Sequence, residues 1–268
     1  MPPSRSPSRN AKPAPSRRNL WPMVLIGLIA MLAVIAAALP ASIIARFLPP
    51  LLHAEDFSGT VWHGSAGKIS VDAHDAGALE WTLHPASLLG LAVDADLHWV
   101  KVGFVVDAAV KMNAHGLTAH AVKGGGPIED LRDLGVEPGW RGTAEINLTV
   151  LKGDFAKPLA AVGDIRVSNL AAAQIADGTD LGGYDLRLAD GAVGTDGTVT
   201  AQVVDTGGPL DLQAVVRYAP SDRTATLTGT LRERPDAPAA LRSQLGNLSQ
   251  LRGRDSQGRI PLDFELRF

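Results

Sequence analysis

Histidines are the side chains in this sequence with the clearest capacity for chemistry. The chain has seven: His53, His63, His74, His84, His98, His115 and His120. None has the spacing of an HExxH zinc helix. His115 and His120 are five apart in a predicted strand, so they point to opposite faces and cannot share a metal ion unless a bulge intervenes. We interpret all seven as ordinary exposed or half-buried histidines and predict no metal site.

Other catalytic patterns are incomplete. Gly67-Lys68 suggests a phosphate loop, but the positions that need a Gly and a Ser or Thr hold Trp62 and Ile69. No GxSxG elbow occurs, and the absence of cysteine removes thiol nucleophiles and Cys-based metal sites. Acidic residues fall in turn dipeptides such as Asp190-Gly191 and Asp196-Gly197. We therefore predict no catalytic, cofactor-binding or metal-binding residue, and no cofactor.

Four tryptophans admit two interpretations. If Trp62, Trp81, Trp99 and Trp140 were exposed together, they would form a platform for a glycan or a peptide. Otherwise they pack in the core and between strands, which is the interpretation that we prefer.

An uncharged run near the N-terminus determines where the rest of the chain lies relative to a membrane. Residues 20–39 read LWPMVLIGLIAMLAVIAAAL. Twenty helical residues at about 1.5 Å each span about 30 Å, the thickness of a bilayer's hydrocarbon core. A cleaved signal peptide is the alternative, because Ala36-Ala37-Ala38 offers a small-residue site, but the run exceeds the usual 7–15 residues. A buried core helix is a third reading, disfavoured because the run lacks a polar face.

Charge on the two sides of this run predicts its orientation. Residues 1–46 carry six basic groups and no acid, which leaves 19 of the 25 basic residues against all 28 acidic ones and a net charge of −9 for the remainder. The positive-inside rule places the basic head in the cytoplasm and the rest on the other side of the membrane. An acidic globular part argues against a nucleic-acid partner. We predict a disordered basic head at 1–19, a transmembrane anchor at 20–45 and a β-rich domain across the membrane at 46–268.

Alternation of apolar and polar residues dominates that domain. It predicts two strands within 57–71, separated by a bend or bulge near Gly64, and alternation at 77–83, 91–110, 142–150, 164–170, 185–188, 198–203, 209–218 and 223–232. Residues 102–111 and 115–123 fit two more strands about a turn at Asn113–Gly116. A helical turn is predicted at 85–90 and another at 128–134, with a subdomain seam near 124–139. Residues 237–250 carry leucines at helical spacing and predict an amphipathic helix packed on the sheet. The last strand, 258–268, contains Pro261 and is predicted at an edge.

These elements predict a mainly β fold class: an extended, curved antiparallel sheet with one or two short helices behind a single transmembrane helix.

The order of several motifs resembles a known family. These motifs are Gly59–Ala66, Leu79–Leu89, Arg141–Ile146, Thr206–Leu212, Leu227–Arg232 and Gly253–Ile260. In this order, behind one N-terminal anchor, they resemble type II secretion system protein N. The resemblance implies a non-enzymatic accessory component of the inner membrane, with the domain at 46–268 in the periplasm, which contacts other secretion components during export of folded proteins. It implies no catalytic residues.

Two further hypotheses stay open at this point. A curved sheet with one apolar face, and a distant likeness to AsmA-like proteins, suggest a groove that binds or handles lipid. Whether Leu148, Val167 and Leu212 face an open trough or the helix at 237–250 discriminates this hypothesis. A membrane-anchored hydrolase would need a histidine and two carboxylates brought together in a cleft.

Overall fold

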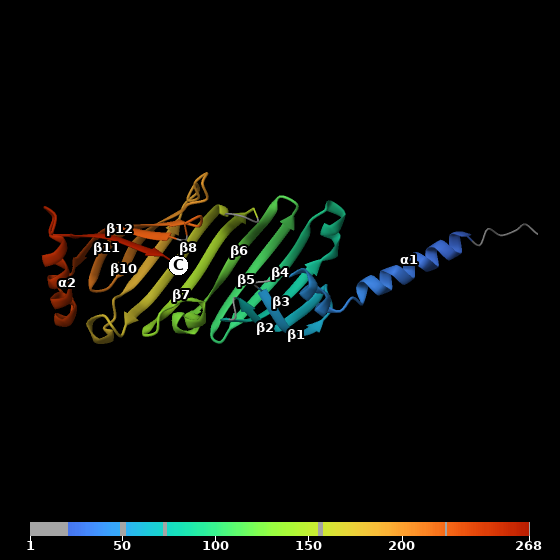
Figure 1. The fold of residues 1–268 in the computed structure, drawn as a ribbon, viewed down its shortest axis with the longest axis horizontal. Helices are drawn as coiled ribbons and strands as arrows, with labels where there is room; N and C mark the ends of the chain where they lie inside the picture. Colours follow the sequence, from blue (N-terminus) through green and yellow to red (C-terminus); the bar gives the residue numbers. More distant parts are fainter. Residues whose placement is uncertain (1–20, 49–51, 72–73, 155–157, 223, 268) are drawn as a thin grey trace, which may run out of the picture. The chain divides into compact units, whose positions relative to one another are not determined.

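The alternating stretches of the sequence form one open antiparallel sheet. In the computed structural model, the described residues are 21–48, 52–71, 74–154, 158–222 and 224–267. Within them, thirteen strands pair strictly in chain order, from β1 to β13 (Figure 1). The chain divides into two units, Met1–Leu39 and Pro40–Phe268, and the sheet lies in the second.

The strands range from six to fifteen residues, and their bounds are as follows. They are β1 (Leu52–Gly59), β2 (His63–Val71), β3 (His74–His84), β4 (Val93–Lys101), β5 (Phe104–Asn113), β6 (Gly116–Pro127), β7 (Trp140–Gly153), β8 (Pro158–Ala172), β9 (Gly183–Leu188), β10 (Val199–Gly207), β11 (Leu210–Ala219), β12 (Thr224–Glu233) and β13 (Ile260–Arg267).

The strand register keeps an apolar row running across the whole sheet. Each of its thirteen residues lies opposite the next one on the neighbouring strand: Phe57, Ala66, Leu79, Trp99, Val106, Gly124, Ile146, Ile165, Leu186, Val203, Ala214, Gly229 and Leu262. We call the face that carries this row the apolar face. Because strand side chains alternate between faces, the residues next to it in sequence lie on the opposite, polar face.

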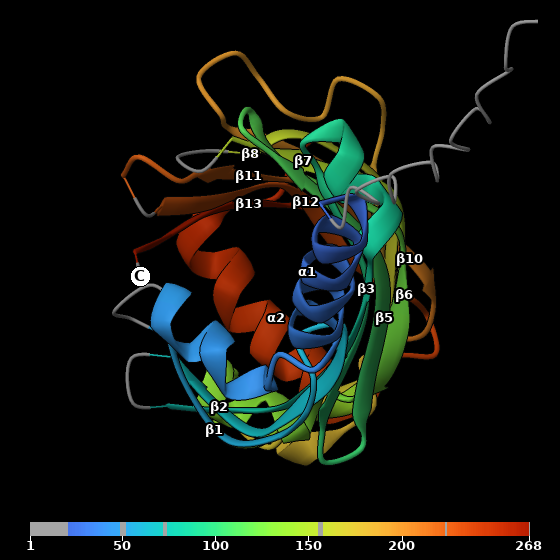
Figure 2. The same ribbon diagram turned by 90° about the vertical axis from the view of Figure 1, so that its right-hand side faces the viewer.

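The sheet curls around helix α2 (Ala239–Arg252), as Figure 2 shows, and because this helix packs on the apolar face, that face is the concave one. The glycines of the apolar row lie where the backbone of a neighbouring strand comes very close. A Cβ on Gly229 would lie 2.5 Å from Ala214 Cα, a separation that real Cβ atoms essentially never show. Glycine at this position therefore permits the close approach of β11 and β12.

The described part of the domain has five short helices, which are η1 (Ala41–Phe47), η2 (Pro85–Gly90), η3 (Ile128–Leu134), η4 (Ala176–Gly178) and α2 (Ala239–Arg252). Three of them, η1, η3 and α2, cover parts of the apolar face. At the C-terminal end, Leu241 and Leu245 of α2 pack with Ile260 and Leu262 of β13 in the largest core cluster. At the N-terminal end, Ala41 of η1 packs with Ala66 and Trp81. In the middle, Ile128 of η3 packs with Phe104 and Ala144.

The first unit contains one described helix, α1 (Trp21–Ala37). It has 17 residues, and helical structure ends before Leu39, because the residue that precedes a proline disfavours the helical conformation. Leu20, the first residue of the expected transmembrane run, lies outside the described residues. Among the described residues, no helix is both long enough and apolar enough to cross a membrane.

Most sequence-based expectations for the sheet are confirmed. Helical turns occur at η2 and η3, and the expected amphipathic helix is α2. β13 pairs with β12 alone, so Pro261 does lie in an edge strand. β6 continues through Gly124-Gly125-Gly126, at the start of the subdomain seam predicted near 124–139. The domain boundaries stay predictions.

Bulges change which residues face inward. In β6 the apolar face carries Ala119 and then Val122, because Ala121 is an extra residue with a φ of +50°. In β2 it carries Ala66 and then Ile69. A strict period of two would place these pairs on opposite faces. The continuous apolar face therefore depends on bulges that alternation alone does not reveal.

The packing of α2 generates a stability test. Leu241 is 2% exposed, so we expect Leu241→Ala to lower the free energy of unfolding by about 2–5 kcal/mol, through lost transfer energy and the cavity left behind. Leu251 on the same helix is 86% exposed, and Leu251→Ala should change it by less than about 0.5 kcal/mol. Urea unfolding followed by circular dichroism measures both. Equal effects of the two substitutions would contradict this packing.

Candidate functional site

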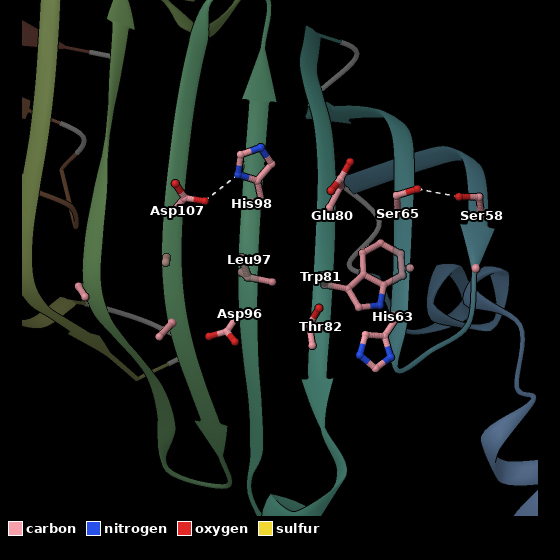
Figure 3. A pocket seen from close by; sticks show the side chains of 15 residues that line it. Ser58, His63, Ser65, Glu80, Trp81, Thr82, Asp96, Leu97, His98 and Asp107 are labelled. Carbon is pink, nitrogen blue, oxygen red and sulfur yellow. Dashed lines mark hydrogen bonds and ion pairs between the residues drawn. The ribbon is translucent and has the colours of Figure 1, made fainter.

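A polar groove lies on the polar face of β1 to β5. It has a volume of about 660 Å³. One cross-strand row of side chains follows it: Ser58, Ser65, Glu80, His98 and Asp107 (Figure 3). Two hydrogen bonds hold neighbouring members of the row. The hydroxyl oxygens of Ser58 and Ser65 are 2.8 Å apart, and His98 Nδ1 lies 2.6 Å from Asp107 Oδ1.

This groove brings together a histidine and two carboxylates, the arrangement that the hydrolase hypothesis requires. Glu80 on β3 and Asp107 on β5 flank His98 in the register. Ser65 is two strands from His98, about 10 Å at 4.8 Å per strand. A hydroxyl nucleophile must lie within about 3 Å of its base. The groove therefore lacks the contact that acyl transfer needs.

The His98–Asp107 pair is also open to water. The His98 and Asp107 side chains are 43% and 65% exposed. Ion pairs and hydrogen bonds at such sites are screened, and preorganised electrostatic catalysis depends on excluding water. A second pair on the same face, His84 Nε2 and Asp96 Oδ2 at 3.4 Å, is exposed in the same way. We interpret both as cross-strand pairs that stabilise the polar face.

The other residues weighed from the sequence lie apart from one another. Among the described residues, no group of three or more His, Asp or Glu side chains is placed to hold a metal ion. His115 lies in a turn and His120 in β6. Gly67 and Lys68 lie inside β2, where Lys68 faces Glu55 of β1, and not in a loop before a helix. Neither feature forms a binding site for phosphate or metal.

Tryptophans pack in the core at three separate places. Trp81 is buried with Ala41 and Ala66, and Trp99 packs on the cluster around Phe104. Trp140 contacts both that central cluster and the C-terminal core. The indole N–H groups of Trp81 and Trp99 donate to the carbonyls of Val61 and Ala76 at 2.9 and 2.6 Å. Trp62 lies half-buried in the bend between β1 and β2. The positions of Trp81, Trp99 and Trp140 agree with core and inter-strand packing and do not form a shared platform.

An apolar cavity of about 370 Å³ lies between η1 and the first four strands. All of its lining side chains are apolar: Ile44, Leu48, Leu52, Ala54, Phe57, Ala66, Ile69, Leu79, Trp81, Leu83 and Leu97. The rings of Phe57 and Trp81 meet edge to face, with centroids 6.4 Å apart. Pockets that bind small ligands have volumes from about 300 Å³ and predominantly apolar walls. We call this space the N-terminal cavity.

Farther along, the apolar face is covered unevenly. Leu212 packs on the cluster that contains Leu241 of α2. Val167 packs on the cluster that contains Ile128 of η3. Leu148 belongs to a cluster made of strand residues alone. Of the three residues, Leu212 thus packs with the helix at the C-terminal end, Val167 packs near η3, and Leu148 packs among strand residues.

The sequence patterns do not predict two buried charged residues. Lys101 is 3% exposed on the apolar face, where its ammonium donates to the carbonyl of Asp75 at 2.5 Å and to Asp133 Oδ2 at 3.0 Å. Asp185 is 5% exposed on the polar face of β9, and its Oδ1 accepts from Arg166 Nε at 2.9 Å. The partners named lie on other strands or on η3, far away in the sequence, so no local pattern predicts these contacts.

Hydrogen bonds from arginine side chains lower the pKa of two carboxyl groups. The pKa of Asp185 lies below its ordinary value, mainly because Arg166 donates to the carboxylate. The pKa of Glu233 is lowered in the same way by Arg254. Burial acts in the other direction on Tyr184 and raises the pKa of its hydroxyl to about 12. None of these groups lies in the polar groove, so they support the fold and not a reaction.

Comparison with known proteins finds one family. The model of a family described as type II secretion system (T2SS), protein N, matches residues 50–263. This range covers β1 to β12 and the first half of β13, but not η1. Neither the curated proteins nor the solved structures include a match to the chain.

The Asp185–Arg166 contact makes stability depend on pH. Because the native pKa of Asp185 is lowered, its contribution is present above about pH 4 and is lost as the pH falls through the native pKa. We expect Asp185→Asn to lower the free energy of unfolding by about 1–2 kcal/mol at pH 7, and the difference from the wild type to shrink below pH 4. Urea unfolding between pH 3 and pH 7 measures it. Asp190→Asn, at an exposed turn, serves as the control, and a difference that stays constant with pH would contradict the role of Asp185.

Proposed function

The chain belongs to the type II secretion system protein N family, and from this premise we propose that it is a non-enzymatic accessory component anchored in the inner membrane, with its β domain in the periplasm. The match of the family model over residues 50–263 carries the proposal. The family is one of secretion accessory proteins and implies interaction with other type II secretion components.

Membrane anchoring is supported by the surface of α1. The large apolar side chains Leu25, Ile26, Leu28, Met31, Leu32, Val34 and Ile35 are between 48% and 67% exposed. A helix that exposes apolar side chains all round needs lipid or another protein around it. The uncharged run continues on both sides of α1, from Leu20 to Ala45. The six basic residues in 1–46 then favour a cytoplasmic N-terminus.

The absence of cysteine makes the proposed topology directly testable. We expect Asp190→Cys, at an exposed turn of the β domain, to react with a membrane-impermeant maleimide in cells with a permeable outer membrane. Ser6→Cys in the basic head should react only after the inner membrane is opened. The intact chain should stay in the membrane pellet at alkaline pH, with its full mass of 28.1 kDa.

Each alternative outcome has a distinct meaning. Release of a shorter chain that begins after Ala38 would support a cleaved signal peptide instead of an anchor. Labelling of Asp190→Cys only after the inner membrane is opened would contradict the periplasmic location.

The C-terminal edge of the sheet has features of a contact surface for another secretion component. β13 pairs on one side only, so the backbone groups on its other side have no partner strand. Phe264 and Leu266 on this strand are 41% and 61% exposed, and Leu251 of α2 is 86% exposed. Exposed edges accept an additional strand, with backbone hydrogen bonds for affinity and side chains for specificity. We infer that a strand of another secretion component pairs with β13.

Substitution at this edge tests the inferred contact. We expect Leu266→Asp to weaken recovery of secretion components in pull-downs about tenfold and to reduce export, because an edge apolar contact is replaced by a charge. Leu159→Asp, at a residue that is 49% exposed on β8, is the matched control and should leave both unchanged. Normal secretion after deletion of the whole gene, together with a pull-down that recovers no component, would refute the secretion role itself.

Lipid binding is a second candidate function, favoured by the N-terminal cavity. Its walls are wholly apolar, and its position under η1 leaves the rest of the sheet free for protein contacts. The two functions are compatible on one chain. Lipid that co-purifies with the full chain, detected by mass spectrometry, would favour the second.

A further inference from the structure

The walls of the N-terminal cavity exclude most classes of ligand. All the lining side chains are apolar, and the single polar atom of the Trp81 indole donates outside the cavity to the Val61 carbonyl at 2.9 Å. A peptide would bring backbone N–H and C=O groups into this space without partners, which costs free energy for each group. A sugar or nucleotide would lose its hydration in the same way. A hydrocarbon chain carries no such groups.

The connection to α1 favours a chain drawn from the membrane. η1 begins at Ala41, four residues after α1 ends at Ala37, and four residues reach at most about 14 Å. If α1 lies in the bilayer, the cavity wall formed by Ile44 and Leu48 lies close to the membrane surface. Arg46, between these two residues in sequence, is exposed and supplies a positive charge for a phosphate headgroup.

We propose that the N-terminal cavity binds one acyl chain of a phospholipid from the inner membrane. This inference rests on the proposed membrane anchor and deepens the lipid-binding candidate by naming its site. The bound chain lies between η1 and the edge-to-face pair of Phe57 and Trp81. The lipid thereby holds the β domain at the bilayer surface.

Photo-crosslinking in vesicles tests the site. The full chain is reconstituted with a phosphatidylglycerol that carries a diazirine near the end of one acyl chain. After irradiation, labelled residues are located by mass spectrometry. We expect label on two separate segments, α1 and the cavity wall around Phe57 and Trp81.

Blocking the cavity sharpens the test. Ala54→Phe places a ring inside the cavity, and we expect it to reduce labelling of the cavity wall at least about tenfold while α1 stays labelled. Ala109→Phe adds the same ring on the exposed polar face and should change neither. Ile69→Trp is a second blocking substitution, used if circular dichroism shows that Ala54→Phe does not fold.

The outcomes distinguish a failure of lipid binding in the cavity from a failure of the membrane anchor. Label on α1 without label on the cavity wall overturns the inference and leaves the anchor standing. Label on neither segment refutes the anchor and, with it, a membrane-derived ligand. Undiminished wall labelling in a folded blocking variant also overturns the inference.

Discussion

The structure depends on strand register more than on any single contact. Thirteen residues, from Phe57 to Leu262, lie opposite one another across all the strands, and each is apolar or glycine. Since side chains alternate with a period of two, a slip of one residue between any two strands would bring a polar row into the core. The adjacent row, from Ser58 to Asp263, is polar at twelve of its thirteen positions, with Val215 as the exception. The two rows together fix the register, and the register fixes which face curls inward.

The two faces therefore offer different chemistry. On the polar face, side chains such as His98 and Asp107 pair across strands but stay open to water, so their charges are screened. On the apolar face, the curl removes side chains from water even where no helix covers them, as at Leu148, which is 9% exposed. A concave apolar surface can bind ligands by burial alone, whereas the convex polar surface would need a lid to concentrate its charges. The fold thus favours binding over catalysis.

Sequence patterns predicted the strands well because each strand carries its own alternation, as in Gly142–Val150. They predicted η2, η3 and α2 because proline, glycine and leucine spacing are local signals. They could not predict which residues face inward beyond a bulge, as at Ala121, since an extra residue reverses the phase of the alternation. They also missed the buried Lys101, whose partner Asp133 is 32 residues away on η3. The N-terminal cavity was equally hidden, because η1 meets the sheet through contacts that no local pattern encodes.

Pairing in chain order also explains why the two ends of the sheet matter most. Each strand contacts its sequence neighbours, so stability is close to a sum of neighbouring interfaces, and the terminal strands have a partner on one side only. Both ends are reinforced from the apolar face, by η1 at β1 and by α2 at β13. The C-terminal reinforcement is tightly packed, with Ile260 and Leu241 at 0% and 2% exposure, but the N-terminal one leaves an open apolar pocket of about 370 Å³. Apolar side chains that line such a pocket stay in contact with water, which forgoes about 25 cal/mol for each Å² of apolar surface. A ligand that covers these side chains and binds only the folded chain would stabilise it, so binding there and stability of the terminal strands are linked.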